Sequence, residues 1–256
     1  MNTSIKIILG VSAICLLGIV VCLYLRTANG NTNQNGETTD TLAVKRVHNL
    51  IILDESGSMS GLEQVSVNGV NETIQTIKEA HLANPEQEQL FTMVTFSTSN
   101  GIRITHHYDS QPINEVNEMK VSQFHPNGMT PLWDVMGQMC TNLEKVVDKE
   151  SLALVTIITD GMENASTEYD REKIKALVEK LDSVGWVFTY IGANQDAVFE
   201  ANSMGIKNAL QYDSDENGTR EMWEKERNSR KAFYERTQTM KSRSELKEGY
   251  FKKDDE

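Results

Sequence analysis

The chain has 256 residues, of which 39% are hydrophobic, so it is long enough for one large domain with a substantial core. Its formal net charge is −12, and residues 43–219 contain 26 acidic against 12 basic side chains. Nucleic-acid-binding domains need a basic surface, so this charge argues against nucleic acid as a partner.

Residues 1–26 predict a membrane anchor. The 19 residues from Ile7 to Leu25 carry no charge, which matches the roughly 20 residues that span a bilayer. The alternative is a cleaved signal peptide, but its apolar region is usually shorter, and Arg26 stands where a small residue is expected. Lys6 favours an N-terminus on the inside. We therefore expect a single-pass membrane protein whose domain lies on the extracytoplasmic side.

Three further segments follow the predicted anchor. Residues 27–42 are polar and rich in Asn, Thr and Gly, which is typical of a flexible linker. Residues 43–217 are expected to form the folded domain. Residues 218–256 are highly charged and predict a last helix over Arg220–Arg236, followed by a frayed or disordered end.

Strands and helices alternate across the predicted domain. Apolar runs predict six strands, at Val44–Leu53, Leu90–Ser97, Ile102–Tyr108, Leu152–Thr159, Trp186–Ile191 and Ala209–Tyr212. Helical spacing predicts helices at Val67–Leu82, Pro131–Val147, Ile174–Val184 and Asp196–Met204. The Asn100-Gly101 turn predicts an antiparallel edge strand. The expected fold is therefore α/β and doubly wound, with a mostly parallel six-stranded sheet and helices on both faces, as in Rossmann-like domains.

Oxygen-bearing side chains follow two of the apolar strands and precede one helix. Asp54 begins the motif Asp-x-Ser-x-Ser, which also contains Ser56 and Ser58, and Asp160 closes a second strand. Thr130 stands just before a predicted helix. Ligands of such sheets bind beyond the carboxyl ends of the strands, and Mg²⁺ prefers oxygen ligands. Each residue alone is explained by a turn or a helix cap, but the set of five predicts a metal site.

These motifs resemble those of von Willebrand factor type A domains. The segments Asp54–Gly61, Asp160–Ser166 and Gly185–Phe188 resemble an uncharacterised bacterial branch of that family. The resemblance covers about Val44–Tyr212 and rests on Asp54-Glu55-Ser56-Gly57-Ser58, Thr130-Pro131 and Thr159-Asp160-Gly161. It implies a domain that binds proteins and has an adhesion-like role. An enzyme is not expected, because the sequence has no Gly-x-Ser-x-Gly, no phosphate-binding loop and no His-Glu-x-x-His motif.

The resemblance also implies a metal-ion-dependent adhesion site (MIDAS). Its ligands would be the hydroxyls of Ser56, Ser58 and Thr130, with Asp54 and Asp160 binding directly or through water. The cofactor would be Mg²⁺, with Mn²⁺ as a substitute, and a Glu or Asp of a protein partner would complete the shell.

Two other functions remain open at this point. One is a phosphatase-like hydrolase that uses Asp54 as its nucleophile, and the other is a scaffold with a vestigial metal site. Several further residues are expected to have ordinary structural roles: Asp134 as a solvated helix charge, His106 and His107 on the surface, His125 near but outside the site, Cys140 as a buried thiol, and Trp133 and Trp186 in the core.

Overall fold

The computed structural model describes residues 44–193, 196–247 and 249–251. The predicted anchor, residues 1–26, and the predicted linker, residues 27–42, lie outside the described residues. Among the described helices, none combines the length and the apolar character needed to cross a bilayer.

The core of the domain is one six-stranded sheet with the order β3-β2-β1-β4-β5-β6. The pair β2 and β3 is antiparallel, and all other neighbours are parallel. The predicted fold class is therefore confirmed. The strands are β1 (Arg46–Asp54), β2 (Glu88–Thr98), β3 (Ile102–Pro112), β4 (Ser151–Thr159), β5 (Val187–Ala193) and β6 (Asn208–Tyr212).

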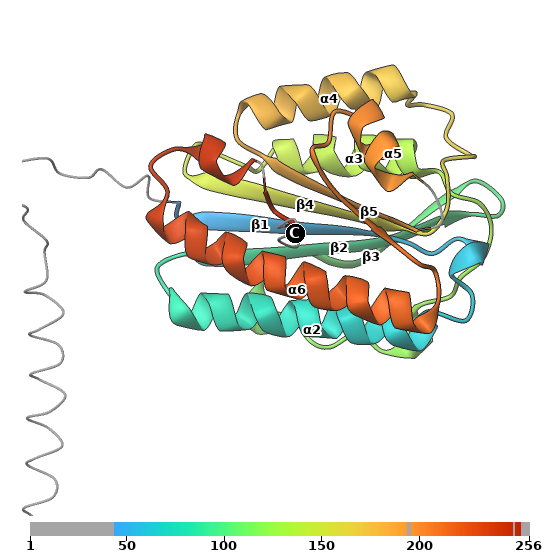
Figure 1. The fold of residues 1–256 in the computed structure, drawn as a ribbon, viewed down its shortest axis with the longest axis horizontal. Helices are drawn as coiled ribbons and strands as arrows, with labels where there is room; N and C mark the ends of the chain where they lie inside the picture. The colour runs from blue at the N-terminus through green and yellow to red at the C-terminus, as the bar shows by residue number, and fades with distance from the viewer. Residues whose placement is uncertain (1–43, 194–195, 248, 252–256) are drawn as a thin grey trace, which may run out of the picture. The chain divides into compact units, whose positions relative to one another are not determined.

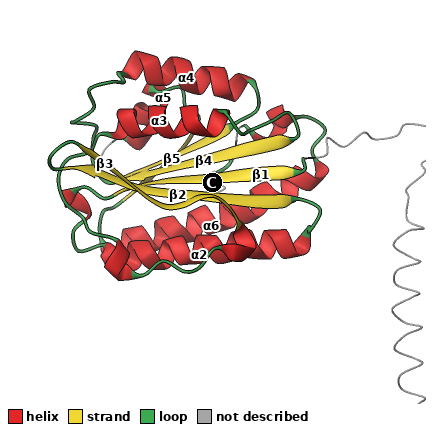
Figure 2. Cartoon of the chain, turned by 180° about the vertical axis from the view of Figure 1, so that it is seen from behind, coloured by secondary structure: helices red, strands yellow, loops and turns green. Residues whose placement is uncertain are grey.

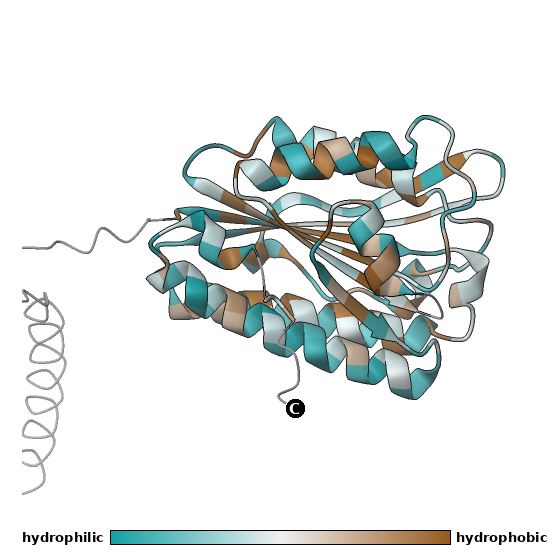
Figure 3. Ribbon diagram, turned by 45° about the horizontal axis from the view of Figure 1, so that its top comes forward, coloured by the Kyte–Doolittle hydropathy of each residue, from teal (hydrophilic) through white to brown (hydrophobic). Residues whose placement is uncertain are grey.

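Two layers of helices cover the sheet (Figure 1), and the view from behind shows the same arrangement (Figure 2). One layer contains α2 (Glu63–Ala83) and α6 (Glu216–Thr239). The other contains α3 (Leu132–Glu144), α4 (Arg171–Ser183) and α5 (Ala197–Ser203). Alternate residues of each strand face the two layers. Because both faces are buried, the central strands are apolar almost throughout (Figure 3).

The predicted buried residues are in the core, with one exception. Cys140 on α3 is 1% exposed, and Trp186 is 2% exposed. Trp133 is only half-buried, and the guanidinium carbon of Arg171 lies 5.7 Å from the centre of its ring. This contact joins the first turns of α3 and α4.

The C-terminal segment differs from the expectation. The last helix extends four residues earlier and three residues later than Arg220–Arg236, because α6 spans Glu216–Thr239. The residues after it were expected to be frayed or disordered, and this is wrong for the part of the tail that the structure describes. Leu246 and Tyr250 are at most 1% exposed and pack in the same core as α2 and α6.

A buried ion pair explains why this polar helix still packs against the sheet. Glu226 and Arg230 are both fully buried, and the Nε of Arg230 donates to Oε1 of Glu226 at 2.8 Å. The guanidinium also donates to Asn49 of β1 at 3.1 Å and to Thr156 of β4 at 2.8 Å. The hydroxyl of Tyr250 donates to Glu226 at 3.0 Å. Buried charges are tolerated only with such partners, which the apolar spacing of the sequence does not reveal.

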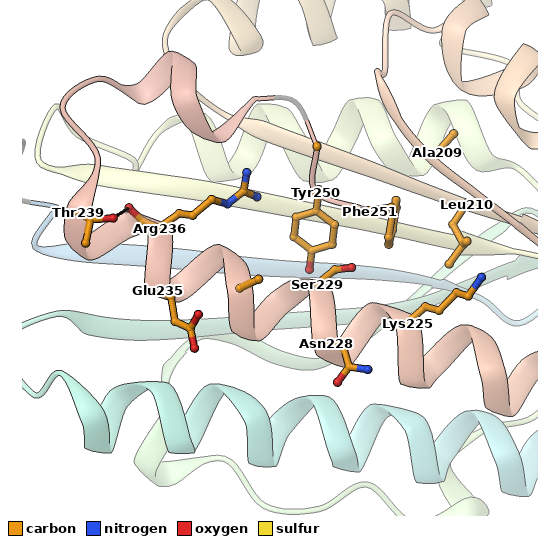
Figure 4. Close-up of a pocket in the computed structure, with 12 residues that line it drawn as sticks. Ala209, Leu210, Lys225, Asn228, Ser229, Glu235, Arg236, Thr239, Tyr250 and Phe251 are labelled. Carbon is orange, nitrogen blue, oxygen red and sulfur yellow. Dashed lines mark hydrogen bonds between the residues drawn. The ribbon is translucent and has the colours of Figure 1, made fainter. Parts of the chain in front are cut away.

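A groove of about 720 Å³ lies between α6, β6 and residues 249–251 (Figure 4). Lys225 and Ser229 of α6 line one side, and Tyr250 and Phe251 line the other. None of the five predicted metal ligands lines this groove.

Candidate metal centre

The two predicted aspartates lie side by side where the order of the strands reverses. The chain passes from β1 to β2 on one side, and β4 lies next to β1 on the other. Asp54 is the last residue of β1, and Asp160 directly follows β4. The register pairs Leu53 with Ile158, so both carboxylates emerge from the same edge of the sheet. This is the usual position of ligand sites in open α/β sheets.

Hydrogen bonds connect four of the five predicted residues. Oδ1 of Asp54 accepts from the backbone N–H of Ser56 at 2.7 Å, and Oδ2 accepts from the Thr159 hydroxyl at 2.6 Å. The hydroxyls of Ser56 and Ser58 lie 3.1 Å apart, and Ser58 donates to Oδ1 of Asp160 at 2.6 Å. The loops after β1 and β4 are therefore joined through their polar side chains.

Gly161 shows that Thr130 belongs to the same cluster. A β-carbon built on Gly161 would lie 3.3 Å from Oγ1 of Thr130, 3.5 Å from Oγ of Ser58 and 3.9 Å from Oδ2 of Asp54. Oxygens from two loops thus lie beside the third loop, at a position where glycine places no side-chain atom. The structure brings all five predicted residues together.

The cluster is buried on most sides and reaches the solvent through one residue. Asp54, Ser56, Thr130 and Asp160 are between 0% and 7% exposed, whereas Ser58 is an exposed residue. Burial raises the pKa of Asp54 to about 6, although hydrogen bonds from Thr159 and Ser56 act in the opposite direction. The nearby charge of Asp160 raises the pKa of Asp54 further.

The donor set has the chemistry of a site for a hard cation. The described residues contain no group of three His, Cys, Asp or Glu side chains that could bind a metal, so a zinc site of the usual kind is not found among them. The cluster instead offers two carboxylates and three hydroxyls, all oxygen donors, which suit Mg²⁺ or Mn²⁺.

Glu55 holds the first loop against the segment that carries Thr130. Its carboxylate is 2% exposed and accepts from the backbone N–H of His125 and, at 2.9 Å, from Nη2 of Arg103. The adjacent backbone N–H of Gly57 donates to the carbonyl of Gly128 at 3.0 Å. His125 thus acts through its backbone, outside the cluster.

The loop after β4 holds the same segment from the other side. The backbone N–H of Thr130 donates to the side chain of Asn164 at 2.8 Å, and the N–H of Asn164 donates to the carbonyl of Thr130 at 3.1 Å. Oε2 of Glu163 accepts from the N–H of Trp133 at 2.9 Å. These bonds occupy N–H groups at the start of α3 that no helical carbonyl can reach.

The prediction that Asp134 is a solvated helix charge is wrong. Asp134 is 4% exposed and accepts from the backbone N–H groups of Thr167, Glu168 and Tyr169 at 2.6–2.9 Å. It therefore orders the loop between β4 and α4. Its partners stand more than 30 residues away in the chain, so the local sequence offers no signal for this role.

The two histidines predicted on the surface lie away from the cluster. His106 is exposed, and the half-buried ring of His107 lies 3.0 Å from the hydroxyl of Thr95.

The fold is similar to that of several solved structures, although no protein-family model and no curated protein matches the sequence. A von Willebrand factor type A protein from Catenulispora acidiphila has a TM-score of 0.50 and 15% identity, over 73% of this chain and 43% of that one. The minor pilin PilB from Streptococcus sanguinis has a TM-score of 0.54 and 13% identity, over 75% of this chain and 62% of that one. The pilus adhesin SpaC from Lactobacillus rhamnosus GG has a TM-score of 0.56 and 12% identity, over 73% and 31%.

This chain spans less than two thirds of each of these three proteins. The identities are low, so the similarity concerns the fold. The strand order and the two helical layers, together with this similarity, show that the chain has a von Willebrand factor type A-like fold.

Proposed function

We propose that this protein binds a divalent cation at the oxygen cluster and recognises a protein partner through an acidic residue. Ser56, Ser58 and Thr130 would hold the ion through their hydroxyls, with Asp54 and Asp160 directly or through water. Mg²⁺ is the expected ion, and Mn²⁺ is a substitute. When bound, the ion supplies positive charge and a coordination position for the partner's carboxylate.

One observation carries the proposal: five oxygen-bearing side chains from three loops gather at one edge of the sheet, and three of them lie 3.3–3.9 Å from the position that Gly161 leaves free of side-chain atoms. The charge balance also supports it. The hydrogen bonds described at Asp54 and Asp160 come from hydroxyls and one backbone N–H. A divalent cation would balance the two carboxylates, and neutral hydroxyls would leave it able to attract a further anion.

The site favours binding over hydrolysis. Both oxygens of Asp54 are engaged in hydrogen bonds, and its side chain is fully buried, so it is poorly placed to attack a substrate. The guanidinium of Arg103, which could have held a phosphate, is bonded to Glu55. Two of the proteins with a similar fold are a minor pilin and a pilus adhesin, which accords with an adhesion-like role.

The location is part of the proposal. Residues 1–26 would anchor the chain in the membrane, and residues 27–42 would form a linker to the domain. The domain would then face the extracytoplasmic side, where it could reach a partner close to the membrane.

The direct test is calorimetric titration of the full-length chain with Mg²⁺ and with Mn²⁺. We expect one bound ion per chain, and we expect Asp54→Ala to abolish the binding. Leu82→Gln, a change of a residue that is 75% exposed at the end of α2, serves as the control and should bind normally. If neither ion binds to the wild-type chain, the proposal is wrong, and a scaffold with a vestigial site becomes the better description.

A further inference from the structure

An exposed apolar rim borders the oxygen cluster. It consists of Ile102, Met129 and Met162, which are 41%, 53% and 64% exposed. Met129 precedes Thr130, and Met162 follows Gly161, so two of the three stand next to residues of the cluster. A single exposed apolar side chain is ordinary on a protein surface. Three of them beside one polar site are typical of an interaction surface.

The backbone places Ile102 and Met129 on either side of one residue. Thr98 pairs with Ile102 in the β2–β3 ladder and forms an isolated bridge with Met129. Residues directly opposite each other in a sheet point to the same face, so these two side chains flank Thr98 on one surface. The close approach is fixed by Gly128, where a β-carbon would lie only 1.9 Å from the carbonyl oxygen of Thr98.

Met162 joins this surface from the opposite loop. The bond from the N–H of Asn164 to the carbonyl of Thr130 holds the loop after β4 beside the segment that carries Met129. The exposed Ser58 is the part of the oxygen cluster that reaches the solvent. Ser58, Met129 and Met162 are therefore exposed residues of the three segments that form the cluster.

The charges of the domain restrict what that partner can be. Residues 43–219 have a net charge of −14. A cation held by Asp54, Asp160 and neutral hydroxyls would keep a coordination position for one carboxylate, while the remaining acidic surface repels any others. Methionine side chains are flexible and polarisable, and they adapt to apolar groups of different shapes.

We propose that the partner presents a single Asp or Glu with apolar side chains within about two residues of it, and that these side chains pack on Ile102, Met129 and Met162. This rests on the proposed function, because the carboxylate would bind the ion. It adds that the rim selects the residues on either side of the carboxylate, and that clusters of acidic residues are disfavoured.

The test uses arrayed 12-residue peptides with one central Glu or Asp and randomised flanking residues. The full-length chain is applied in Mg²⁺ and in EDTA. We expect binding in Mg²⁺ only, with apolar residues enriched beside the carboxylate and additional acidic residues depleted. The variant Met129→Gln/Met162→Gln should bind the selected peptides about tenfold more weakly, because contact with apolar surface is lost. Its Mg²⁺ affinity, measured by calorimetry, should be unchanged.

The control is again Leu82→Gln, which removes an apolar side chain that is 75% exposed. Leu82 lies near the end of α2, before the start of β2, and the cluster lies where the strands end. It should keep the wild-type preference. If carboxylate peptides bind in Mg²⁺ without any preference for apolar neighbours, or if the double methionine variant selects the same peptides as the wild type, the rim has no such role and the proposed function still stands. If no carboxylate peptide binds in a Mg²⁺-dependent way, the proposed function fails and this inference fails with it.

Discussion

Gly161→Ala tests whether a cation binds among the oxygens next to Gly161. Gly161 is not among the glycines with positive φ, so its backbone accepts an alanine. The added methyl group would lie 3.3–3.9 Å from oxygens of Thr130, Ser58 and Asp54. The closest of these contacts is tight, but a shift of a few tenths of an ångström relieves it. We therefore expect the stability of the metal-free chain to change by less than about 1 kcal/mol.

The effect on the ion should be much larger. Changes beside metal ligands typically weaken binding about 10–100-fold, and a methyl group here would crowd the ion and its water. At a Mg²⁺ concentration of 100 times the wild-type Kd, binding stabilises the wild type by about 2.7 kcal/mol. With a 100-fold weaker Kd, the stabilisation falls to about 0.4 kcal/mol. For a domain of this size the shift in Tm should shrink from about 5–10 °C to about 1–2 °C.

The assay is thermal unfolding with and without Mg²⁺, with calorimetry to give the Kd. Gly57→Ala is the matched control, because it stands in the first loop of the site, yet its β-carbon would meet only the backbone of Gly128 at 3.5 and 3.8 Å. It should keep the full Mg²⁺-dependent shift. A Gly161→Ala chain that keeps this shift would refute the placement of the ion. If both variants lose the Mg²⁺-dependent Tm shift equally, the cause is the reduced flexibility of the loops and not a clash with the ion.

Three further predictions follow from buried or tightly held carboxylates. Because folding raises the pKa of Asp54 from its ordinary value of 3.8 to about 6, the folded state binds the proton more tightly. In EDTA the free energy of unfolding should therefore fall by about 2 kcal/mol as the pH rises from 4 to 7. In urea unfolding, the Asp54→Asn variant should not show this decline. If the pH profiles of the variant and the wild type run parallel, the prediction is wrong. Arg230→Met leaves the buried charge of Glu226 without its partner and should lower the free energy of unfolding by about 3–5 kcal/mol. Adding Glu226→Leu should recover part of this loss. If denaturant unfolding shows no recovery, the pairing is refuted. Glu163→Ala removes the acceptor of the Trp133 N–H and should weaken Mg²⁺ binding about tenfold and accelerate hydrogen exchange at that amide, and unchanged exchange would argue against this role.

Local patterns were sufficient for the sheet and for the cluster. Apolar runs place β1 and β4, and parallel strands with helical connections bring their carboxyl ends together, so Asp54 and Asp160 could be placed near each other from the sequence. Thr130 could be included because helix starts lie at the same edge. Whether these residues bind a metal stays a prediction.

The supports of the cluster could not be predicted in this way. Glu163 and Asp134 bind backbone N–H groups about 30 residues away, and no local spacing encodes such contacts. The same holds for α6, where Arg230 sits on the buried face and breaks the apolar pattern that marks a core helix. In each case a polar side chain is buried because distant groups satisfy it.

The buried thiol of Cys140 has a consequence for the environment in which this domain can operate. It is a free cysteine, and burial, with a smaller effect from Glu144, raises its pKa to about 12. The thiolate is the form that reacts with oxidants and disulfides, and this pKa keeps it scarce at physiological pH. In the folded domain this thiol should therefore exchange with oxidised glutathione only through unfolding, which exposes it.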